Sequence, residues 1–427
     1  MNILVVSNIE WSDENAFGNT ISNWFFEMED IHFASLYTRN AYPQNSVCRK
    51  YYSITFTSII RNIFRPERIG YQFEYQPRTS NALSNIEQKK TASRRAERKI
   101  IAFIQRNNLK VVYKIQEYAF KSKLWSNSRF RAFILDYSPD IVFSFIESPI
   151  EVNLLIKEII RLKPECKFVG FVADDVYGSA PAEKYKRNIR EQIDTASIVY
   201  GASSELCNNY TILFNKKISP LYKGCKFKDM KRYLDHESIV IVYAGNLYYG
   251  RVSSLIALAN TIEKYNSSHL RKIELHIYSN NELSRTEKAI LSRKGVTQLY
   301  GIRPYVEILR IMQEADIVLH VESFDDEQQR IVRYSFSTKI IDCLQSESVF
   351  LCIGPKGIAS IEYAKKIPGA IVVDDINNLE AALERIGNTE LKELAQLTNC
   401  FAKENHTISQ TTERLENELR SLVEGSK

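Results

Sequence analysis

Residues 315–355 hold side chains suited to binding a ligand that carries phosphate and hydroxyl groups. The segment is typical of a buried strand, a polar loop, a helix and a second buried strand. Ser337, Thr338 and Lys339 would begin that helix, where free backbone N–H groups and the helix dipole attract anions. Asp342, about one turn further on, only accepts hydrogen bonds and therefore suits hydroxyl groups. An ordinary capped surface helix with a solvated Asp342 would produce the same pattern.

A second candidate is the segment AGNLYYGR (244–251), between an expected strand and an expected helix. Gly245 would permit a tight turn and a close approach of the backbone to a ligand. Asn246 lies beside it in the same turn. Arg251 would meet a diphosphate with a forked and permanently charged guanidinium group. An ordinary strand–helix turn with a surface Arg is the alternative interpretation.

Two carboxylates end another expected strand. Asp174 and Asp175 follow the apolar run 167–173, at the edge where parallel sheets commonly bind ligands. A carboxylate there would orient or deprotonate a substrate hydroxyl, although a helix cap or a turn would use the same pair. Neither this pair nor Asp325-Asp326 has the alternating spacing of a metal–nucleotide motif, and the histidines show no ligand spacing. The sequence therefore predicts no metal site.

These candidates depend on a regular alternation of apolar runs and helical patterns. Strands are expected near residues 3–7, 31–37, 141–145, 167–173, 197–203, 238–245, 272–279, 296–301, 316–322, 349–355 and 370–375. Amphipathic helical patterns separate most of them, which is typical of parallel sheets. The alternation is interrupted near 215–237 and then restarts. We therefore expect an α/β protein with two Rossmann-like halves.

The predicted domain boundaries follow from that interruption. Residues 1–220 would form the first domain, with a basic helical insertion at about 51–137. Residues 221–405 would form the second domain. The helix expected within 406–427 is too polar for a core element and would pack back across the seam between the domains.

The composition is that of an ordinary globular protein. Of 427 residues, 44% are hydrophobic and 25% are charged, and a formal net charge of +6 is too small to indicate nucleic-acid binding. The seven cysteines are dispersed, which favours free thiols in a reducing compartment. We find neither a basic leader nor an apolar run of about 18 residues. A soluble, cytoplasmic protein is expected.

A basic stretch at 89–131 is rich in Lys and Arg and contains only Glu97 and Glu117 as acids. A solvated helical face commonly carries such charge. A second interpretation is peripheral contact with an anionic membrane at its inner face, because clustered cations are attracted to anionic lipids. No recognition motif accompanies the charge, so a nucleic-acid partner is not expected.

Together these features resemble the retaining glycosyltransferases of the GT-B fold, family-four type, and especially their bacterial surface-polysaccharide members. The resemblance rests on the two halves, the Gly-Asn-Leu-x-x-x-Arg turn at 245–251, and the Ser-Thr-Lys helix before a strand ending in Gly354-Pro355. It implies two domains facing a central cleft, with a nucleotide sugar bound to the C-terminal half. The donor-binding residues that it implies are Gly245, Asn246, Arg251, Ser337, Thr338, Lys339 and Asp342.

The chain departs from the family pattern at two places. The turn usually reads Gly-Arg-Leu followed by a Lys, whereas here Asn246 replaces the first basic residue and Arg251 replaces the second. The family also carries two spaced Glu residues. The one that holds the ribose falls on Asp342, and the one that touches the donor sugar falls on Tyr334. Glu322 is the candidate catalytic replacement, or else a solvated carboxylate at the end of its strand.

In the first half, Gly18 and Asn19 lie where the family places a glycine-rich loop that faces donor and acceptor. The resemblance implies transfer of a sugar from a nucleoside diphosphate to a glycan or lipid-linked acceptor in surface polysaccharide synthesis, with retention of configuration. It implies no metal and no other cofactor. Two alternatives stay open, a nucleotide-sugar 2-epimerase on the same fold and a non-catalytic binding protein related to transferases.

Overall fold

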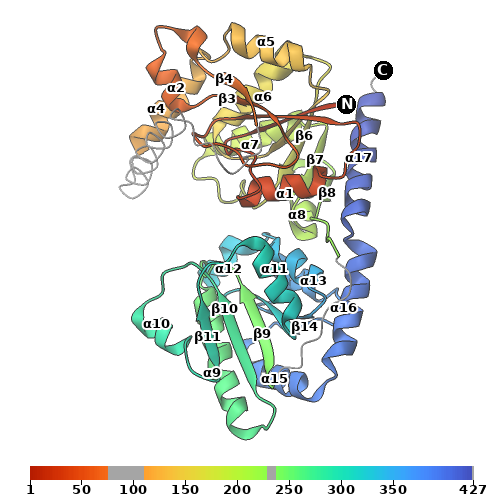
Figure 1. Cartoon of the computed structure of the whole chain (residues 1–427). Helices are drawn as coiled ribbons and strands as arrows, with labels where there is room; N and C mark the ends of the chain where they lie inside the picture. The colour runs from red at the N-terminus through yellow and green to blue at the C-terminus, as the bar shows by residue number, and fades with distance from the viewer. Residues whose placement is uncertain (76–109, 228–236, 426–427) are drawn as a thin grey trace, which may run out of the picture. The chain divides into compact units, whose positions relative to one another are not determined.

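The computed structural model of the protein folds into two compact units (Figure 1). It describes residues 1–75, 110–227 and 237–425. Unit 1 comprises Met1–Tyr200, Tyr210–Ser219 and Thr412–Lys427, and unit 2 comprises Gly201–Asn209 and Pro220–Thr411. The helical pattern predicted at 98–105 lies outside the described residues.

Unit 1 is built on an eight-stranded sheet in the order β4-β3-β2-β1-β5-β6-β7-β8. Its strands are β1 (Asn2–Ser7), β2 (His32–Tyr37), β3 (Lys50–Ser53), β4 (Tyr71–Glu74), β5 (Ile141–Phe145), β6 (Lys167–Val172), β7 (Ile198–Gly201) and β8 (Ile218–Pro220). β1 pairs in parallel with β2 and β5, whereas β4 is antiparallel to β3. The strand order reverses between β1 and β5, so their carboxyl ends are where the topology would place a ligand.

Unit 1 also contains six α-helices before α8 and one short 3-10 helix within its described residues up to Tyr200. They are α1 (Ala16–Phe25), α2 (Phe56–Arg61), η1 (Pro66–Arg68), α4 (Lys110–Lys121), α5 (Ser128–Tyr137), α6 (Ile150–Leu162) and α7 (Glu183–Thr195). Trp24 of α1 makes edge-to-face contacts with Phe143 of β5 and Phe171 of β6. Such contacts add to the burial of apolar area and fix α1 against the centre of the sheet.

Unit 2 is built on a six-stranded sheet in which every pairing is parallel. Its strands are β9 (Ile239–Ala244), β10 (Ile273–Tyr278), β11 (Thr297–Tyr300), β12 (Ile317–Val321), β13 (Val349–Ile353) and β14 (Ile371–Val373). The order β11-β10-β9-β12-β13-β14 is that of a Rossmann sheet. The carboxyl ends of β9 and β12 therefore form the switch point where such sheets bind ligands.

Both faces of the unit 2 sheet are covered. The helices that follow its strands are α9 (Arg251–Ser268), α10 (Arg285–Ile290), α11 (Tyr305–Glu314), α12 (Asp326–Val332), α13 (Lys339–Gln345), α14 (Ala359–Ala364), η2 (Ile376–Asn378), α15 (Leu379–Asn388) and α16 (Leu391–Asn405). Ile241 of β9 packs in one apolar cluster with Leu255, whereas its neighbour Val242 packs in another with Ile340. This alternation explains why the strands are continuous apolar runs.

Two helices contribute residues to both units, namely α8 (Ser204–Phe214) and α17 (Ile408–Glu424). Residues 412–427 belong to unit 1, where the Thr412 hydroxyl donates to the Trp24 carbonyl and Arg420 donates to the Glu29 carbonyl. The polar sequence of α17 thus reflects specific side-chain to backbone contacts as well as exposure to solvent.

The predicted α/β class with two parallel-sheet halves is confirmed, and two local predictions differ from the structure. The described part of 51–137 is not wholly helical, because β3 and β4 pair there and the Tyr51 and Phe73 rings stack across them. The polar loop before Ser337 contains α12, which begins where the Asp325 carboxylate accepts the amides of its first turn. Both elements are stabilised by contacts that apolar spacing does not reveal.

The first turn of α1 makes a prediction about stability. A Cβ atom on Gly18 would lie 2.6 Å from the Ser12 carbonyl carbon, and neither backbone can withdraw. Gly18→Ala should therefore destabilise unit 1 by about 2 kcal/mol or more, although Ala is otherwise the better helix former by about 1 kcal/mol. Urea unfolding followed by tryptophan fluorescence reports this unit, because Trp11, Trp24 and Trp125 all lie in it.

The control is Gly301→Ala, since nothing lies within 4 Å of a Cβ atom built there. Its unfolding midpoint, followed by circular dichroism, should match that of the wild type. Equal midpoints for Gly18→Ala and the wild type would contradict the packing described for α1.

Candidate functional site

Gly245 and Lys339 meet at the switch point of the unit 2 sheet. Gly245 follows β9 directly, and Lys339 is the first residue of α13. A Cβ atom on Gly245 would collide with Lys339 Nζ and would lie 2.8 Å from its Cε. A residue without a side chain is therefore what lets this ammonium group lie against the turn after β9. The structure brings these two predicted residues together.

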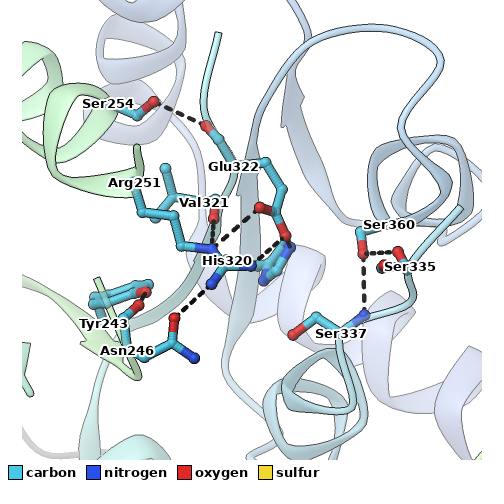
Figure 2. Close-up of polar contacts among 10 residues, drawn as sticks. All are labelled: Tyr243, Asn246, Arg251, Ser254, His320, Val321, Glu322, Ser335, Ser337 and Ser360. Atoms are coloured by element: carbon cyan, nitrogen blue, oxygen red, sulfur yellow. Dashed lines mark hydrogen bonds and ion pairs between the residues drawn. The ribbon is translucent and has the colours of Figure 1, made fainter. Parts of the chain in front are cut away.

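Arg251 is held beside them by a dense set of polar contacts (Figure 2). Its Nη2 donates to Glu322 Oε1 at 3.0 Å, and its Nε lies 3.1 Å from both Glu322 Oε2 and the Val321 carbonyl oxygen. Its Nη1 donates to Asn246 Oδ1 at 2.7 Å. Arg251 is 8% exposed and Glu322 is 2% exposed, so this is a buried ion pair between the start of α9 and the end of β12.

The charges in this group are well matched. Burial opposes ionisation of Glu322, but the neighbouring His320 and Arg251 hold its pKa at about 2. Burial opposes the charge of Arg251 as well, and Glu322 nevertheless raises the pKa of that guanidinium. His320 Nε2 lies 3.0 Å from Glu322 Oε1, and burial lowers the pKa of this imidazole below its usual value. The pair is therefore fully ionised at neutral pH beside a neutral histidine.

Lys339 is less fully compensated, because Glu322 and Asp342 favour its charged form but do not outweigh the opposing effects. Burial, with the positive charge of Arg251 as the second cause, lowers the pKa of its ammonium group to about 8. Two cations thus lie close together at the carboxyl edge of a parallel sheet, and among the described residues Arg251 forms an ion pair with a buried carboxylate whereas Lys339 forms none. An anion placed here would relieve the repulsion, which is the electrostatic requirement for binding a phosphate group.

A cavity of about 260 Å³ adjoins the lysine. It is lined by Ala244, Gly245, Tyr278, Ser279, Asn280, Ile302, Arg303, Tyr305, Ile308, Met312, Lys339 and Asp342. These residues come from the carboxyl ends of β9, β10 and β11 and from α11 and α13. The Tyr278 ring is stacked on Tyr300 at 4.6 Å, which holds one wall of the cavity flat. A planar ring and a polar chain would both fit such a lining.

Asp342 lines the cavity but already has partners. Its Oδ1 accepts a hydrogen bond from the Tyr305 hydroxyl at 2.8 Å and lies 3.7 Å from Lys223 Nζ. Lys223 is buried, so this carboxylate is oriented by a phenol and an ammonium group together. A ligand hydroxyl that binds Asp342 would use the remaining acceptor sites of the carboxylate or displace the tyrosine.

We expected a hydroxyl of Ser337 or Thr338 to cap the helix that begins at Lys339. The structure differs from this expectation. Thr338 is the residue before α13, and its side chain makes no capping hydrogen bond. The Ser337 amide donates to the Ser360 hydroxyl at 3.1 Å, and that hydroxyl donates in turn to the Ser335 carbonyl (Figure 2). The backbone before α13 is therefore shaped by Ser360, a residue that lies in another helix.

Asp175 makes the contacts of a turn residue, which was the alternative interpretation of this pair, and its catalytic role stays a prediction. Its Oδ1 accepts from the Gly178 amide and from the Tyr210 hydroxyl, each at 2.9 Å, so this carboxylate stabilises a turn. Asp174 is exposed at the carboxyl end of β6. Of the pair, Asp174 is the one whose position still suits contact with a substrate hydroxyl.

Gly18 and Asn19 lie in the first turn of α1 and not in a loop, which corrects that prediction. The Asn15 side chain caps this helix by accepting from the Gly18 amide. Gly18 is required because the backbone at Ser12 passes too close for a side chain. The glycine at position 18 is therefore explained by packing and does not require a ligand.

Glu322 makes the contacts of a supporting carboxylate, and its predicted catalytic role stays a prediction. Both of its carboxylate oxygens accept from Arg251, and its side chain is almost inaccessible to solvent. Tyr334, which replaces the family's sugar-binding Glu, accepts from the Ser203 hydroxyl through its backbone carbonyl. The Arg333 guanidinium lies over its ring at 5.3 Å.

Three unit 2 residues contribute to the site although they carry no motif. They are His320, Lys223 and Tyr305. Only Tyr305 has a sequence signal, because it follows Pro304 at the start of a helix after an expected strand. His320 in β12 and Lys223 in the segment before β9 have no sequence signal, and only the structure shows that they lie near the other residues of the site.

In unit 1, the sequence patterns did not reveal one further carboxyl group, that of Glu147. Glu147 follows β5 at its carboxyl end, and burial together with the charge of Glu151 raises its pKa to about 7. The Glu147 backbone carbonyl accepts from Gln192, which holds this segment in place. A carboxyl group that titrates near neutral pH at this edge of a sheet is suited to general acid–base catalysis.

Within the described residues, no group of three or more His, Cys, Asp or Glu side chains is arranged to hold a metal ion. Among the same residues, no helix is both long enough and apolar enough to cross a membrane. The basic stretch at 89–131 is described only from residue 110 onward.

Comparisons with known proteins identify the fold. No protein-family model and no curated protein matches this sequence. A solved E. coli trehalose-6-phosphate structure bound with UDP-2-fluoro glucose matches with a TM-score of 0.60 and 11% identity, covering 98% of this chain and 99% of that one. A Rickettsia africae glycosyltransferase matches with a TM-score of 0.60 and 11% identity, covering 99% and 98%.

Anabaena HepE in complex with UDP and glucose has a TM-score of 0.56 at 9% identity, covering 98% of this chain and 99% of that one. Similarity over nearly the full length of both chains shows that the protein has the GT-B fold. The predicted fold is thereby confirmed.

The buried Arg251–Glu322 pair makes a prediction about unit 2. Arg251→Met or Glu322→Leu alone leaves an uncompensated buried charge and should cost about 3–5 kcal/mol, whereas the double variant should lose less than the sum by about 2 kcal/mol or more. Hydrogen exchange of β9 and β12 amides measures these free energies.

The exposed Lys264–Glu380 pair, with an N···O distance of 2.9 Å, is the control, and its coupling should stay below about 1 kcal/mol. Additive losses at Arg251 and Glu322, within about 0.5 kcal/mol, would contradict the buried pair.

Proposed function

We propose that this protein is a glycosyltransferase that moves a sugar from a nucleoside diphosphate to an acceptor. One observation carries the proposal. The Lys339 ammonium group lies against Gly245 at the switch point of a Rossmann sheet, with Arg251 beside it and a cavity adjoining it. The solved GT-B structures with bound UDP or UDP-2-fluoro glucose support the choice of donor class.

Each donor group has a role in this proposal. Lys339 and the free N–H groups of Arg251 would hold the diphosphate and stabilise its charge as it departs. Asn246 would keep the guanidinium oriented, since it accepts from Nη1. Asp342 would hold ribose hydroxyls, and the adjoining cavity would hold the base between the flat tyrosine wall and the apolar residues of α11.

The finer proposal concerns the acceptor and the chemistry. We infer a glycan or lipid-linked acceptor in surface polysaccharide synthesis, transfer with retention, and no metal cofactor. Two protein cations near the proposed diphosphate site support metal-independent stabilisation of the leaving group. Asp174 and Glu147, both following central strands of unit 1, are the carboxyl groups proposed to orient or deprotonate the acceptor.

Lys339 provides the direct test of this function. Lys339→Ala should weaken binding of a nucleoside diphosphate by about 10-fold to 100-fold, because a charge-assisted contact is worth about 1.5–3 kcal/mol. Calorimetry with UDP, and with the diphosphate that gives the largest rise in melting temperature, measures the loss. Hydrolysis or transfer of the corresponding nucleotide sugar should fall at least as far.

Lys264→Ala is the matched control, since that lysine is exposed on the same unit and its ammonium group pairs with the exposed Glu380. Its affinity and activity should equal those of the wild type. Wild-type affinity and activity in Lys339→Ala would refute the assignment. If the nucleotide sugar alone were converted to its epimer without an acceptor, the protein would be an epimerase and not a transferase.

The lowered pKa of Lys339 makes the binding pH-dependent. The diphosphate needs the charged ammonium group, so affinity should fall as the pH rises through about 8, where the free protein loses that proton. Bound anion favours the protonated form, and binding should therefore take up a proton in this range. Lys339→Arg keeps its charge and should have a flat profile up to pH 10. Identical profiles for both proteins would contradict this account.

A further inference from the structure

A turn after α2 presents apolar side chains to solvent. The Arg65 amide donates to the Asn62 carbonyl at 2.9 Å, which places Ile63 and Phe64 at the two corner positions. Phe64 is 95% exposed, and Ile63 beside it is exposed as well. Burying a Phe side chain is favourable, so a protein gains by covering such a residue.

The turn is firmly held by the rest of unit 1. The Asn127 side chain donates to the Pro66 carbonyl at 2.6 Å and to the Ile69 carbonyl at 2.8 Å. On the other side, the Gly70 amide donates to the Ser58 hydroxyl of α2 at 3.2 Å. The exposure of Phe64 is therefore a property of an anchored element and not of a loose chain.

Positive charge surrounds the apolar tip. Arg61, Arg65 and Arg68 are all exposed, and Glu67 is the one acid between them. Within the described part of the chain, none of the three guanidinium groups takes part in an ion pair. Apolar side chains at a protruding tip and unpaired arginines around it are complementary to a layer that is negatively charged outside and apolar inside.

The neighbouring helix α4 also carries exposed apolar and cationic side chains. α4 packs against α2, and the two lie side by side in Figure 1. Ile115 and Tyr118, one turn apart on α4, are exposed, and so is Lys114 next to them. The helix that packs against α2 thus adds further exposed side chains of both kinds.

We propose that the turn Asn62–Arg65, with the neighbouring surface of α4, docks this protein on an anionic lipid surface. Ile63 and Phe64 would enter the boundary between headgroups and acyl chains, and the three arginines would pair with lipid phosphates. The inference does not depend on the proposed transferase activity. It places the contact chiefly before the basic stretch, on residues whose side chains the structure describes.

Phe64→Trp gives a direct readout. The native tryptophans Trp11, Trp24 and Trp125 are all buried, so the new indole is the exposed one. With vesicles of phosphatidylcholine and phosphatidylglycerol at 3:1, its emission should shift to the blue and brominated acyl chains should quench it. With pure phosphatidylcholine both effects should be much weaker. An emission that vesicles of either composition leave unchanged would overturn the proposal.

Phe64→Ser tests the contribution to affinity. It should weaken co-sedimentation with the anionic vesicles by about 10-fold or more, since about 1.4 kcal/mol corresponds to 10-fold. Leu270→Ser, at a fully exposed leucine of unit 2, should bind like the wild type. Raising the salt to 0.5 M should weaken wild-type binding, because the arginine contribution is screened.

Equal vesicle binding by Phe64→Ser and the wild type would overturn the proposal. So would a dimer in solution that Phe64→Ser converts to a monomer without any vesicle binding, since the tip would then be an interface between copies. Both substitutions lie at an exposed residue of unit 1, so the urea unfolding midpoint followed by circular dichroism should match that of the wild type and reports that each variant is folded.

Discussion

The ion pair between Arg251 and Glu322 is the constraint on which the unit 2 site depends. It joins the start of α9 to the end of β12 across the point where the strand order reverses, and it is almost fully buried. Burying two charges is favourable only when each is well paired, and here the Val321 carbonyl and Asn246 complete the contacts of the guanidinium. The pair fixes one positive charge in place and so leaves the neighbouring lysine as the charge that responds to a ligand.

In the proposed function, that second cation would give the site its selectivity for anions. Lys339 reaches the turn after β9 only because residue 245 is a glycine, and its charged form is disfavoured by burial and by Arg251. A folded protein that holds such a group without a compensating carboxylate gains free energy when an anion binds. The adjoining cavity offers room for the remainder of a nucleotide, with Asp342 already oriented by Tyr305 and Lys223.

Sequence patterns were sufficient for the fold and for part of the site. The predicted strands and helices bring Gly245, Lys339 and Asp342 to one cavity, because the order of strands in a Rossmann sheet brings separate loops together. The patterns fail where a contact decides the role of a side chain. Asp175 is committed to a turn by Tyr210, and Glu322 is committed to Arg251. Neither commitment has a signature in spacing.

The strand order reverses next to the first strand in both sheets, but the two units differ in what lies at the carboxyl edge. Unit 2 presents cations there, whereas the central strands of unit 1 are followed by carboxyl groups, Glu147 and Asp174. A donor site that needs positive charge and an acceptor site that needs a proton acceptor would require this difference. The anchored tip at Phe64 belongs to unit 1, so a lipid surface and a lipid-linked acceptor would engage the same unit.

The central claim is that Lys339 contacts the diphosphate of a bound nucleotide. Its accessibility to acetic anhydride at pH 8, measured by mass spectrometry with and without UDP or another diphosphate that binds, tests this most directly. The account predicts that Lys339 is acetylated in the free protein and strongly protected by the nucleotide, while the exposed Lys264 is acetylated equally in both samples. Equal acetylation of Lys339 with and without a nucleotide that is shown to bind would contradict it.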